Sequence, residues 1–160
     1  MKEIDLLHGM FALVDDDDYE WLSQYKWYYA GKYAIRTKKK NSKTKTFYMH
    51  REIMRCKKGE EVDHANGNRL DNQRKNLRLC NQSQNSSNRD AKIGCTSKYK
   101  GVYWNKKALK WYARVCFGRK CVYFGSFDDE KEAASAYNEH AFLYYGTFAR
   151  LNNVEEENNG

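Results

Sequence analysis

The chain has 160 residues, a net charge of +8, a pI of about 9.2 and a mean hydropathy of −1.00. This length suits one ordinary domain or two small ones. No run approaches the roughly 18 apolar residues of a membrane span, so no membrane partner is expected. The basic balance favours a polyanionic partner such as nucleic acid. The first residues lack the basic start, long apolar core and cleavage site of a signal peptide, so we expect a cytoplasmic protein.

The chain has five cysteines, an odd number, and they include no Cys-x-x-Cys pair of the kind that holds structural zinc. This pattern predicts reduced thiols. Cys116 and Cys121 flank an expected hairpin turn containing Gly118, where they can be cross-strand neighbours without being bonded.

Residues 1–60 read as a β-rich scaffold. Residues 4–14 predict one or two short strands. Residues 15–25 begin with four aspartates and continue with apolar residues at helical spacing. Consecutive aspartates suit a helix N-terminus better than a calcium site, whose ligands alternate along the chain.

Residues 26–36 and 45–51 are rich in aromatic residues and predict the two strands of a hairpin. Its tip, residues 36–45, holds six basic residues and no acidic one. We expect Lys38, Lys39 and Lys40 to contact phosphates, although such a tip can also be plain solvated surface. His50 and Arg51 follow. We expect a structural or phosphate-contacting role for His50 and a DNA contact for Arg51.

Residues 62–89 are the most informative part of the chain. They begin with Asp63 and His64 and continue through a polar loop with turn signals at residues 66–67 and 71–72. A short alternating segment containing Asn76 follows, and then a segment that can start a helix, with Asn81 as N-cap and Gln84 at capping-box spacing. Strand, loop, strand and helix can bring the polar side chains onto one cleft.

These residue types suit one kind of chemistry. A neutral imidazole accepts a proton from water near neutral pH. A carboxylate and an amide oxygen hold a hard divalent cation, which offsets charge on a phosphoryl group. The combination predicts metal-assisted phosphodiester hydrolysis.

The stretch resembles the HNH endonucleases, a family with a ββα-metal fold. The resemblance lies in DHANGN at residues 63–68, DNQRKNLR at 71–78 and QNSSN at 84–88. It implies His64 as general base, Asp63 and Asn85 as ligands of one Mg²⁺ or Mn²⁺ ion, and Asn76 as a residue that braces the loop and orients His64. Asn88, three residues after Asn85, remains an alternative ligand.

The remaining chain predicts a separate domain after a short polar linker. Residues 99–104, 111–117 and 121–125 read as three strands that place aromatic and basic side chains on one face. A helix follows, with Asp129 as N-cap and Gly146 as its stop. An apolar stripe would pack it on the sheet: Ala133, Tyr137, Ala141 and Tyr144.

This part resembles the APETALA2-type (ERF) DNA-binding domain, through SKYKGV at residues 97–102, VYFGSF at 122–127, EAASAY at 132–137 and ARLN at 149–152. The resemblance implies that Lys100, Tyr103, Arg114 and Tyr123 face DNA. Arg89, at the end of the nuclease stretch, is a further expected DNA contact. Strand one has Tyr103, Trp104 and Asn105 where plant members carry arginines, so their base preference does not transfer. Trp111 and Phe127 are expected in the core.

The prediction is therefore an α+β protein. Its parts are a scaffold at residues 1–60, a ββα-metal HNH core at 61–92, a linker at 93–97, a three-stranded antiparallel sheet with a helix at 98–152, and an acidic disordered tail at 153–160. The expected function is a metal-dependent endonuclease of homing or phage type in a bacterial or phage-infected cell. It would act on double-stranded DNA rather than a small molecule, and nick one strand as a monomer or weak dimer. The alternatives are a DNA-binding regulator with an idle nuclease fold and an RNA-binding protein.

Overall fold

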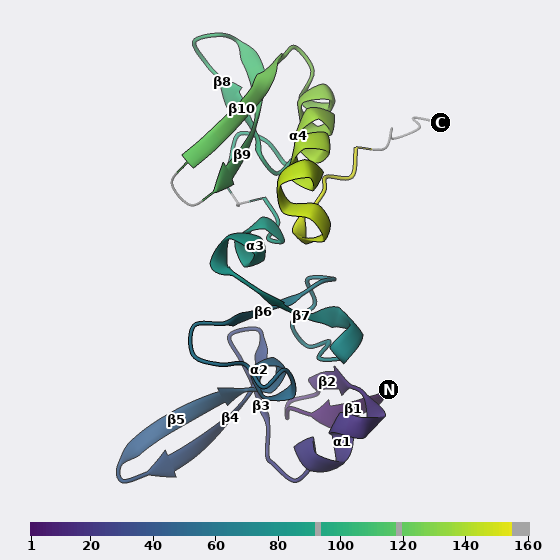
Figure 1. Ribbon diagram of the computed structural model, residues 1–160, viewed down its shortest axis with the longest axis vertical. Helices are drawn as coiled ribbons and strands as arrows, with labels where there is room; N and C mark the ends of the chain where they lie inside the picture. The colour runs from purple at the N-terminus through teal and green to yellow at the C-terminus, as the bar shows by residue number, and fades with distance from the viewer. Residues whose placement is uncertain (92–93, 118–119, 155–160) are drawn as a thin grey trace. The chain divides into compact units, whose positions relative to one another are not determined.

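The computed structural model describes residues 1–91, 94–117 and 120–154. The chain divides into two compact units, residues 1–85 and 86–160, and the division falls inside helix α3 (Gln82–Ser87). Both units combine strands with helices (Figure 1), which confirms the α+β class. No helix among the described residues is long and apolar enough to cross a membrane.

The first unit opens with the antiparallel pair β1 (Lys2–Asp5) and β2 (Phe11–Val14), so residues 4–14 contribute to two strands. Helix α1 (Asp16–Leu22) follows, with three aspartates in its first turn, where the helix dipole favours negative charge. Asp18 is buried and pairs with Arg74, with 2.7 Å between the Arg74 Nη2 and Asp18 Oδ1 atoms. The aspartate run therefore stabilises the start of α1, and Asp18 links this helix to the loop that contains Arg74.

The aromatic segment forms three strands, which corrects the expectation of two. β3 (Tyr28–Ala30), β4 (Tyr33–Lys40) and β5 (Lys43–Tyr48) make an antiparallel sheet in the order β3-β4-β5. The first expected strand is broken because Gly31 and Lys32 take positive φ angles and turn the chain. The second ends early, because residues 49–51 begin helix α2 (Met49–Ile53). His50 therefore lies on a helix.

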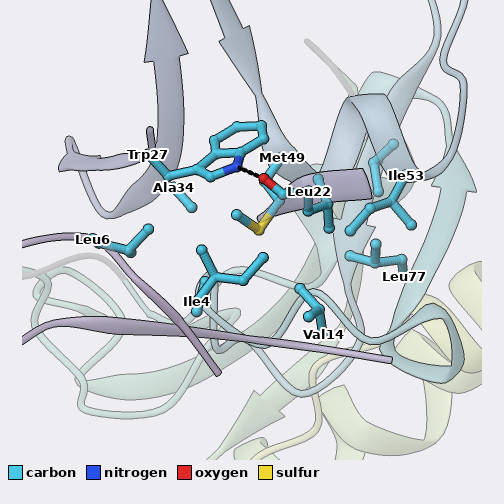
Figure 2. Packing of buried hydrophobic residues seen from close by; sticks show 11 residues of the cluster. Ile4, Leu6, Val14, Leu22, Trp27, Ala34, Met49, Ile53 and Leu77 are labelled. Carbon is cyan, nitrogen blue, oxygen red and sulfur yellow. Dashed lines mark hydrogen bonds between the residues drawn. The ribbon is translucent and has the colours of Figure 1, made fainter. Parts of the chain in front are cut away.

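A single apolar cluster holds the first unit together (Figure 2). Trp27, Met49, Leu22 and Val14 are almost completely buried within it, and the Trp27 indole N–H donates to the Leu22 carbonyl oxygen at 2.9 Å. Each such side chain contributes about 1.5–3 kcal/mol through removal from water. The cluster extends to Val62 and Leu77, two buried apolar residues of the next strand pair, and so fixes the position of that pair.

The nuclease-like stretch forms β6 (Glu61–His64), the 3₁₀ turn η1 (Arg74–Asn76), β7 (Leu77–Cys80) and α3. β6 and β7 pair antiparallel, with Asp63 opposite Arg78 and His64 opposite Leu77. The capping box is confirmed: the Gln84 backbone N–H donates to Asn81 Oδ1, and the Asn81 N–H donates to Gln84 Oε1, both at 2.9 Å. Strand, loop, strand and helix follow in the expected order.

The second unit is an antiparallel sheet of β8 (Val102–Asn105), β9 (Lys110–Phe117) and β10 (Lys120–Phe127), in the order β10-β9-β8. Helix α4 (Glu130–Tyr145) lies along the sheet (Figure 1), followed by the 3₁₀ turn η2 (Gly146–Phe148). Asp129 caps α4 by accepting from the N–H groups of Lys131 and Glu132, and Gly146 ends the helix, as predicted. The expected turn at Gly118 and most of the expected tail lie outside the described residues.

The buried face of α4 differs from the expected stripe at one position. Ala133, Tyr137 and Ala141 are buried, whereas Tyr144 is 48% exposed, and Ala134 is a further buried residue of the helix. Tyr144 instead contacts the rings of Phe117 and Phe124. Trp111 and Phe127 pack against the core as predicted.

Gly101 is a fixed point of this unit. Its φ angle is +75°, and a Cβ atom there would lie 2.0 Å from Tyr137 Cδ2 and 2.7 Å from the Arg114 carbonyl oxygen. A residue with a side chain would collide with backbone and with a buried ring, so only glycine permits this close approach of chain and helix.

The expectation of five reduced thiols is wrong for two of them. Cys116 and Cys121 form a disulfide, while Cys56, Cys80 and Cys95 are free. The bond forms because these two residues face each other directly in the β9–β10 register, with 4.0 Å between their Cα atoms.

Candidate active site

His64 is the last residue of β6 and is only 4% exposed. Its Nε2 atom lies 3.2 Å from the side-chain oxygen Oδ1 of Asn72. The Asn72 amide is itself oriented, because its Nδ2 donates to the Leu70 carbonyl oxygen at 3.2 Å. Oδ1 only accepts, so Nε2 carries the ring proton and the basic lone pair lies on Nδ1. The site thus presents a neutral imidazole in a defined tautomer.

Asn76 holds the loop between the two strands. Its Oδ1 accepts from the Asn66 backbone N–H at 3.0 Å, and its Nδ2 donates to the Asp71 carbonyl oxygen at 2.8 Å. We expected Asn76 to brace the loop and to orient His64. These bonds go to the loop backbone, while Asn72 bonds the ring of His64. The sequence identified residues 71–72 as a turn signal and as the start of a family motif, but it gave no sign that Asn72 would bond the ring of His64.

Aromatic rings surround His64 on the side of the scaffold. The His50 ring lies 5.1 Å from the His64 ring, between centroids, and the Tyr33 ring lies 5.1 Å from His50 and 6.2 Å from His64. His50 Nδ1 is buried and has no hydrogen-bond partner among the described residues. Burial, to which the neighbouring His64, Arg51 and Arg69 add, lowers the pKa of His50 to about 3. His50 is therefore neutral at physiological pH.

The pKa of His64 is also lowered from its ordinary value of 6.5. Burial is the main cause, and it outweighs the hydrogen bond that the ring donates to Asn72 and the nearby carboxylates of Asp63 and Asp71, which favour the charged form. A neutral imidazole at pH 7 can accept a proton, as a general base requires.

Oxygen donors gather where β6 faces α3. Glu61 and Asp63 are two residues apart on β6 and therefore share one face of the strand. Asn85 of α3 donates from Nδ2 to Glu61 Oε2 at 2.6 Å. Asp63 pairs across the strands with Arg78, with 2.6 Å between Arg78 Nη2 and Asp63 Oδ2. No group of three or more His, Cys, Asp or Glu residues able to hold a metal ion occurs among the described residues.

These carboxylate and amide oxygens are of the type that binds a hard cation. Mg²⁺ takes one or two carboxylates and completes its shell with water and substrate phosphate, so a large protein cluster is not required. Asp63, Asn85 and the neighbouring Glu61 offer oxygen atoms of this type. The guanidinium of Arg78 supplies the counter-charge of Asp63 in this structure.

The expected basic tip is the end of the β4–β5 hairpin, a long two-stranded arm in Figure 1. Lys38 lies directly opposite Lys45, and Lys40 opposite Lys43. Like charges opposite each other repel, so these lysines concentrate positive charge on the arm. Arg51 is placed differently: its guanidinium donates to the carbonyl oxygens of Glu60 and Lys57 and ties α2 to the entry of β6.

The second unit brings three of the expected DNA contacts onto one sheet face. Arg114 lies over the Tyr103 ring at 4.7 Å, Tyr103 and Tyr123 are 6.4 Å apart, and Tyr123 lies opposite Arg114 in the register. Lys100 is placed elsewhere. It is half-buried, and its ammonium donates to the carbonyl oxygens of Ser87 and Arg89. Burial lowers the pKa of Lys100 to about 8. The Arg89 side chain itself is exposed.

Comparison with known proteins points to a nuclease family. A family model described as HNH endonuclease matches residues 50–87. An uncharacterized HNH endonuclease of Acanthamoeba polyphaga mimivirus is 30% identical over 156 residues, which cover 92% of this chain and 77% of that protein. Protein 3.8 of Escherichia phage T7 is 36% identical over 94 residues, or 59% of this chain and 77% of the phage protein.

The plant relative matches over a shorter stretch. An ethylene-responsive transcription factor of Arabidopsis thaliana is 40% identical over 58 residues, 35% of this chain, and the match spans only 14% of the factor. No solved structure matches. The match to the mimivirus protein spans nearly the whole chain. The family model covers β6, which ends at His64, together with β7 and α3. The chain belongs to the HNH endonuclease family.

Proposed function

We propose that this chain is a divalent-metal-dependent endonuclease that hydrolyses a phosphodiester bond of double-stranded DNA, with His64 as general base. The observation that carries the proposal is the hydrogen bond between His64 Nε2 and Asn72 Oδ1. It fixes a buried, neutral imidazole with its basic nitrogen at Nδ1, within a family of nucleases.

The chemistry follows from these side chains. Nδ1 of His64 takes a proton from a water molecule, and the water oxygen then attacks phosphorus as the bond to the leaving oxygen breaks. Asp63 and Asn85 would hold one Mg²⁺ or Mn²⁺ ion, which supplies positive charge to the phosphoryl group and the leaving oxygen. Asn76 keeps the loop in place through Asn66 and Asp71. One such site cuts one strand, so a monomer nicks.

Binding to DNA would come from two basic surfaces. The lysines of the β4–β5 arm, including Lys38, Lys39 and Lys40, are exposed and suit phosphate contacts. Tyr103, Arg114 and Tyr123 would contact DNA from the second unit, an assignment supported by the similarity to a plant transcription factor. Phosphate contacts supply affinity and register, and a smaller number of base contacts supply specificity.

The test is relaxation of a supercoiled plasmid with Mg²⁺ or Mn²⁺, comparing the wild type with His64→Ala and with His8→Ala as a control. His8 is an exposed histidine of the same unit. We expect open-circle DNA from the wild type and His8→Ala. His64→Ala should cut at least about 100-fold more slowly, the lower range for loss of a general base. Cleavage by His64→Ala at the wild-type rate would refute the assignment.

A second candidate is a DNA-binding regulator that keeps the nuclease fold without cutting. The ion pair between Asp63 and Arg78 favours it, because a carboxylate engaged by a guanidinium is less available to a cation. Tight DNA binding without cleavage, across several metals and random-sequence substrates, would support this candidate over the endonuclease.

A further inference from the structure

Arg69 lies in the loop that follows His64 and is only half-buried. Its guanidinium carbon Cζ lies 4.9 Å from the centroid of the Tyr33 ring. Tyr33 is the same ring that contacts both His50 and His64. A cation held over an aromatic face keeps a defined position at little cost in hydration, and arginine is the residue best suited to it. Arg69 is thus a cation positioned beside the imidazole by a residue of the scaffold.

The other arginines near this site are engaged. Arg78 pairs with Asp63, Arg74 with Asp18 and Arg36 with Glu52. Arg51 donates to two backbone carbonyls. Arg69, by contrast, makes no hydrogen bond or ion pair within the part of the chain that the structure describes. Its guanidinium makes a cation–π contact with the ring of Tyr33. Its donors therefore remain available to an anion.

The charge of Arg69 acts on the buried rings beside it. It adds to the effect of burial in lowering the pKa of His50. The same field acts favourably on any negative charge that builds near His64. During phosphodiester hydrolysis that charge grows on the phosphoryl oxygens next to the attacking water, and a preorganised donor there lowers the barrier.

We propose that Arg69, held on Tyr33, contacts a non-bridging oxygen of the scissile phosphate and stabilises the charge that develops there. This inference rests on the proposed endonuclease function. It makes Arg69 a catalytic residue and Tyr33 its positioning residue, and it adds a guanidinium fork, which suits two phosphate oxygens, to the histidine and the oxygen donors.

The first test is the single-turnover rate of plasmid nicking at saturating protein, where differences in affinity do not affect the rate. Arg69→Gln should lower this rate by about 100-fold, the loss typical of one preorganised donor. Arg69→Lys keeps the charge and loses the two-pronged guanidinium. Its nicking rate should lie between those of Arg69→Gln and the wild type. Arg55→Gln is the matched control, because Arg55 is an exposed arginine of the same unit, and it should cut within about twofold of the wild type. Arg69→Gln cutting at the wild-type rate would overturn the proposal.

Tyr33 variants test whether the Tyr33 ring positions the guanidinium of Arg69. Tyr33→Phe keeps the ring and should retain the wild-type rate, whereas Tyr33→Leu should lose about tenfold if the ring positions the cation. Equal rates for the two variants would remove Tyr33 from the proposal. A folded first unit is checked in each variant by the dispersion of its amide NMR signals.

The second test does not need cleavage. The Nε–H signal of Arg69 is followed by NMR while a short DNA duplex is added in EDTA, and Arg69→Gln assigns the signal. A shift that saturates with binding supports the phosphate contact. Saturated binding without a shift overturns it. If the wild type cuts no DNA with any metal, the proposed endonuclease function fails, and this NMR result still decides whether Arg69 contacts the phosphate.

Discussion

The imidazole of His64 is held by the side-chain amide of Asn72, with 3.2 Å between Nε2 and Oδ1. Asn72 is completely buried and is fixed in turn through Leu70 and through its backbone N–H, which donates to the Leu13 carbonyl oxygen at 2.8 Å. The orientation of the ring therefore depends on a loop residue that is locked to strand β2. This relationship explains how a loop of polar residues can hold an imidazole in one tautomer.

The first prediction concerns this contact. Asn72→Ala removes the acceptor and should lower the single-turnover nicking rate by roughly 10- to 100-fold, the usual cost of losing the partner that orients a functional imidazole. Asn72→Asp keeps an acceptor at Oδ1 and should recover most of the rate. DNA affinity in EDTA should stay within about threefold for both variants, because Asn72 is buried. If the nicking rates of the two variants follow their thermal stability and not the presence of the acceptor, Asn72 does not act by orienting the His64 ring.

The second prediction concerns the ion pair of Asp63 and Arg78. Arg78→Met leaves the buried Asp63 carboxylate without its guanidinium and should destabilise the first unit by about 3 kcal/mol. Mg²⁺ should recover part of this loss, because a cation at Asp63 replaces the missing counter-charge. Thermal unfolding of the first unit with and without Mg²⁺ measures the effect.

A matched control is available in the same unit. Arg36 pairs with Glu52 at 2.7 Å, with side chains 15% and 20% exposed, and both residues lie outside the proposed metal site. Arg36→Met should also lose stability, and Mg²⁺ should not restore it. Equal recovery in the two variants would mean that the cation acts nonspecifically and that Asp63 is not its ligand.

The third prediction concerns the stability of the first unit in acid. The pKa of folded His50 is about 3, below the ordinary 6.5, because burial disfavours the charged ring and the neighbouring His64, Arg51 and Arg69 act in the same direction. Between these pH values the unfolded chain binds a proton that the folded chain does not. The free energy of unfolding should therefore be fully retained above pH 6.5 and fall below it, by up to about 1.4 kcal/mol per pH unit from this residue.

His50→Gln removes this titration and should flatten the decline between pH 6.5 and 4. His8→Gln, at an exposed position, should leave it unchanged. Denaturation followed through the indole N–H signal of Trp27 reports the first unit alone, since Trp27 lies in its core. A slope identical in His50→Gln and the wild type would show that His50 is not the group responsible.

The fourth prediction concerns the exposed sheet face of the second unit. Arg114→Gln should weaken binding to duplex DNA in EDTA by about 1–2 kcal/mol and reduce the dependence of affinity on salt by about one ion. Tyr123→Ala should weaken binding with little change in that dependence, because the ring carries no charge. Tyr144→Ala is the control, since Tyr144 is similarly exposed and lies on α4. Fluorescence anisotropy across a salt series separates these cases, and unchanged affinity in both sheet variants would remove this face as a DNA contact.

Several features could be predicted from the sequence because they depend on neighbours in the chain. The capping box of Asn81 and Gln84, the N-cap at Asp129 and the helix stop at Gly146 each involve residues within a few positions of one another. The strand, loop, strand and helix order around His64 follows from local alternation and turn chemistry in the same way. Family motifs also pointed to Asp63, His64, Asn76 and Asn85 before any contact was known.

Other features depended on contacts between distant parts of the chain. The partner of the His64 ring is Asn72 rather than Asn76, because β2 and the apolar core fix which side of the loop faces the imidazole. Tyr33 and His50 join the site only because the sheet and α2 pack against β6. The disulfide of Cys116 and Cys121 needs the exact β9–β10 register.

The sequence by itself thus determined the local elements and the order of the motifs, since short-range hydrogen bonding and side-chain periodicity specify these. Only the tertiary structure decided which residues surround His64, which charges are already paired, and which cation remains available beside it. Burial and pairing arise from packing between segments far apart in the chain, and local pattern carries no information on them.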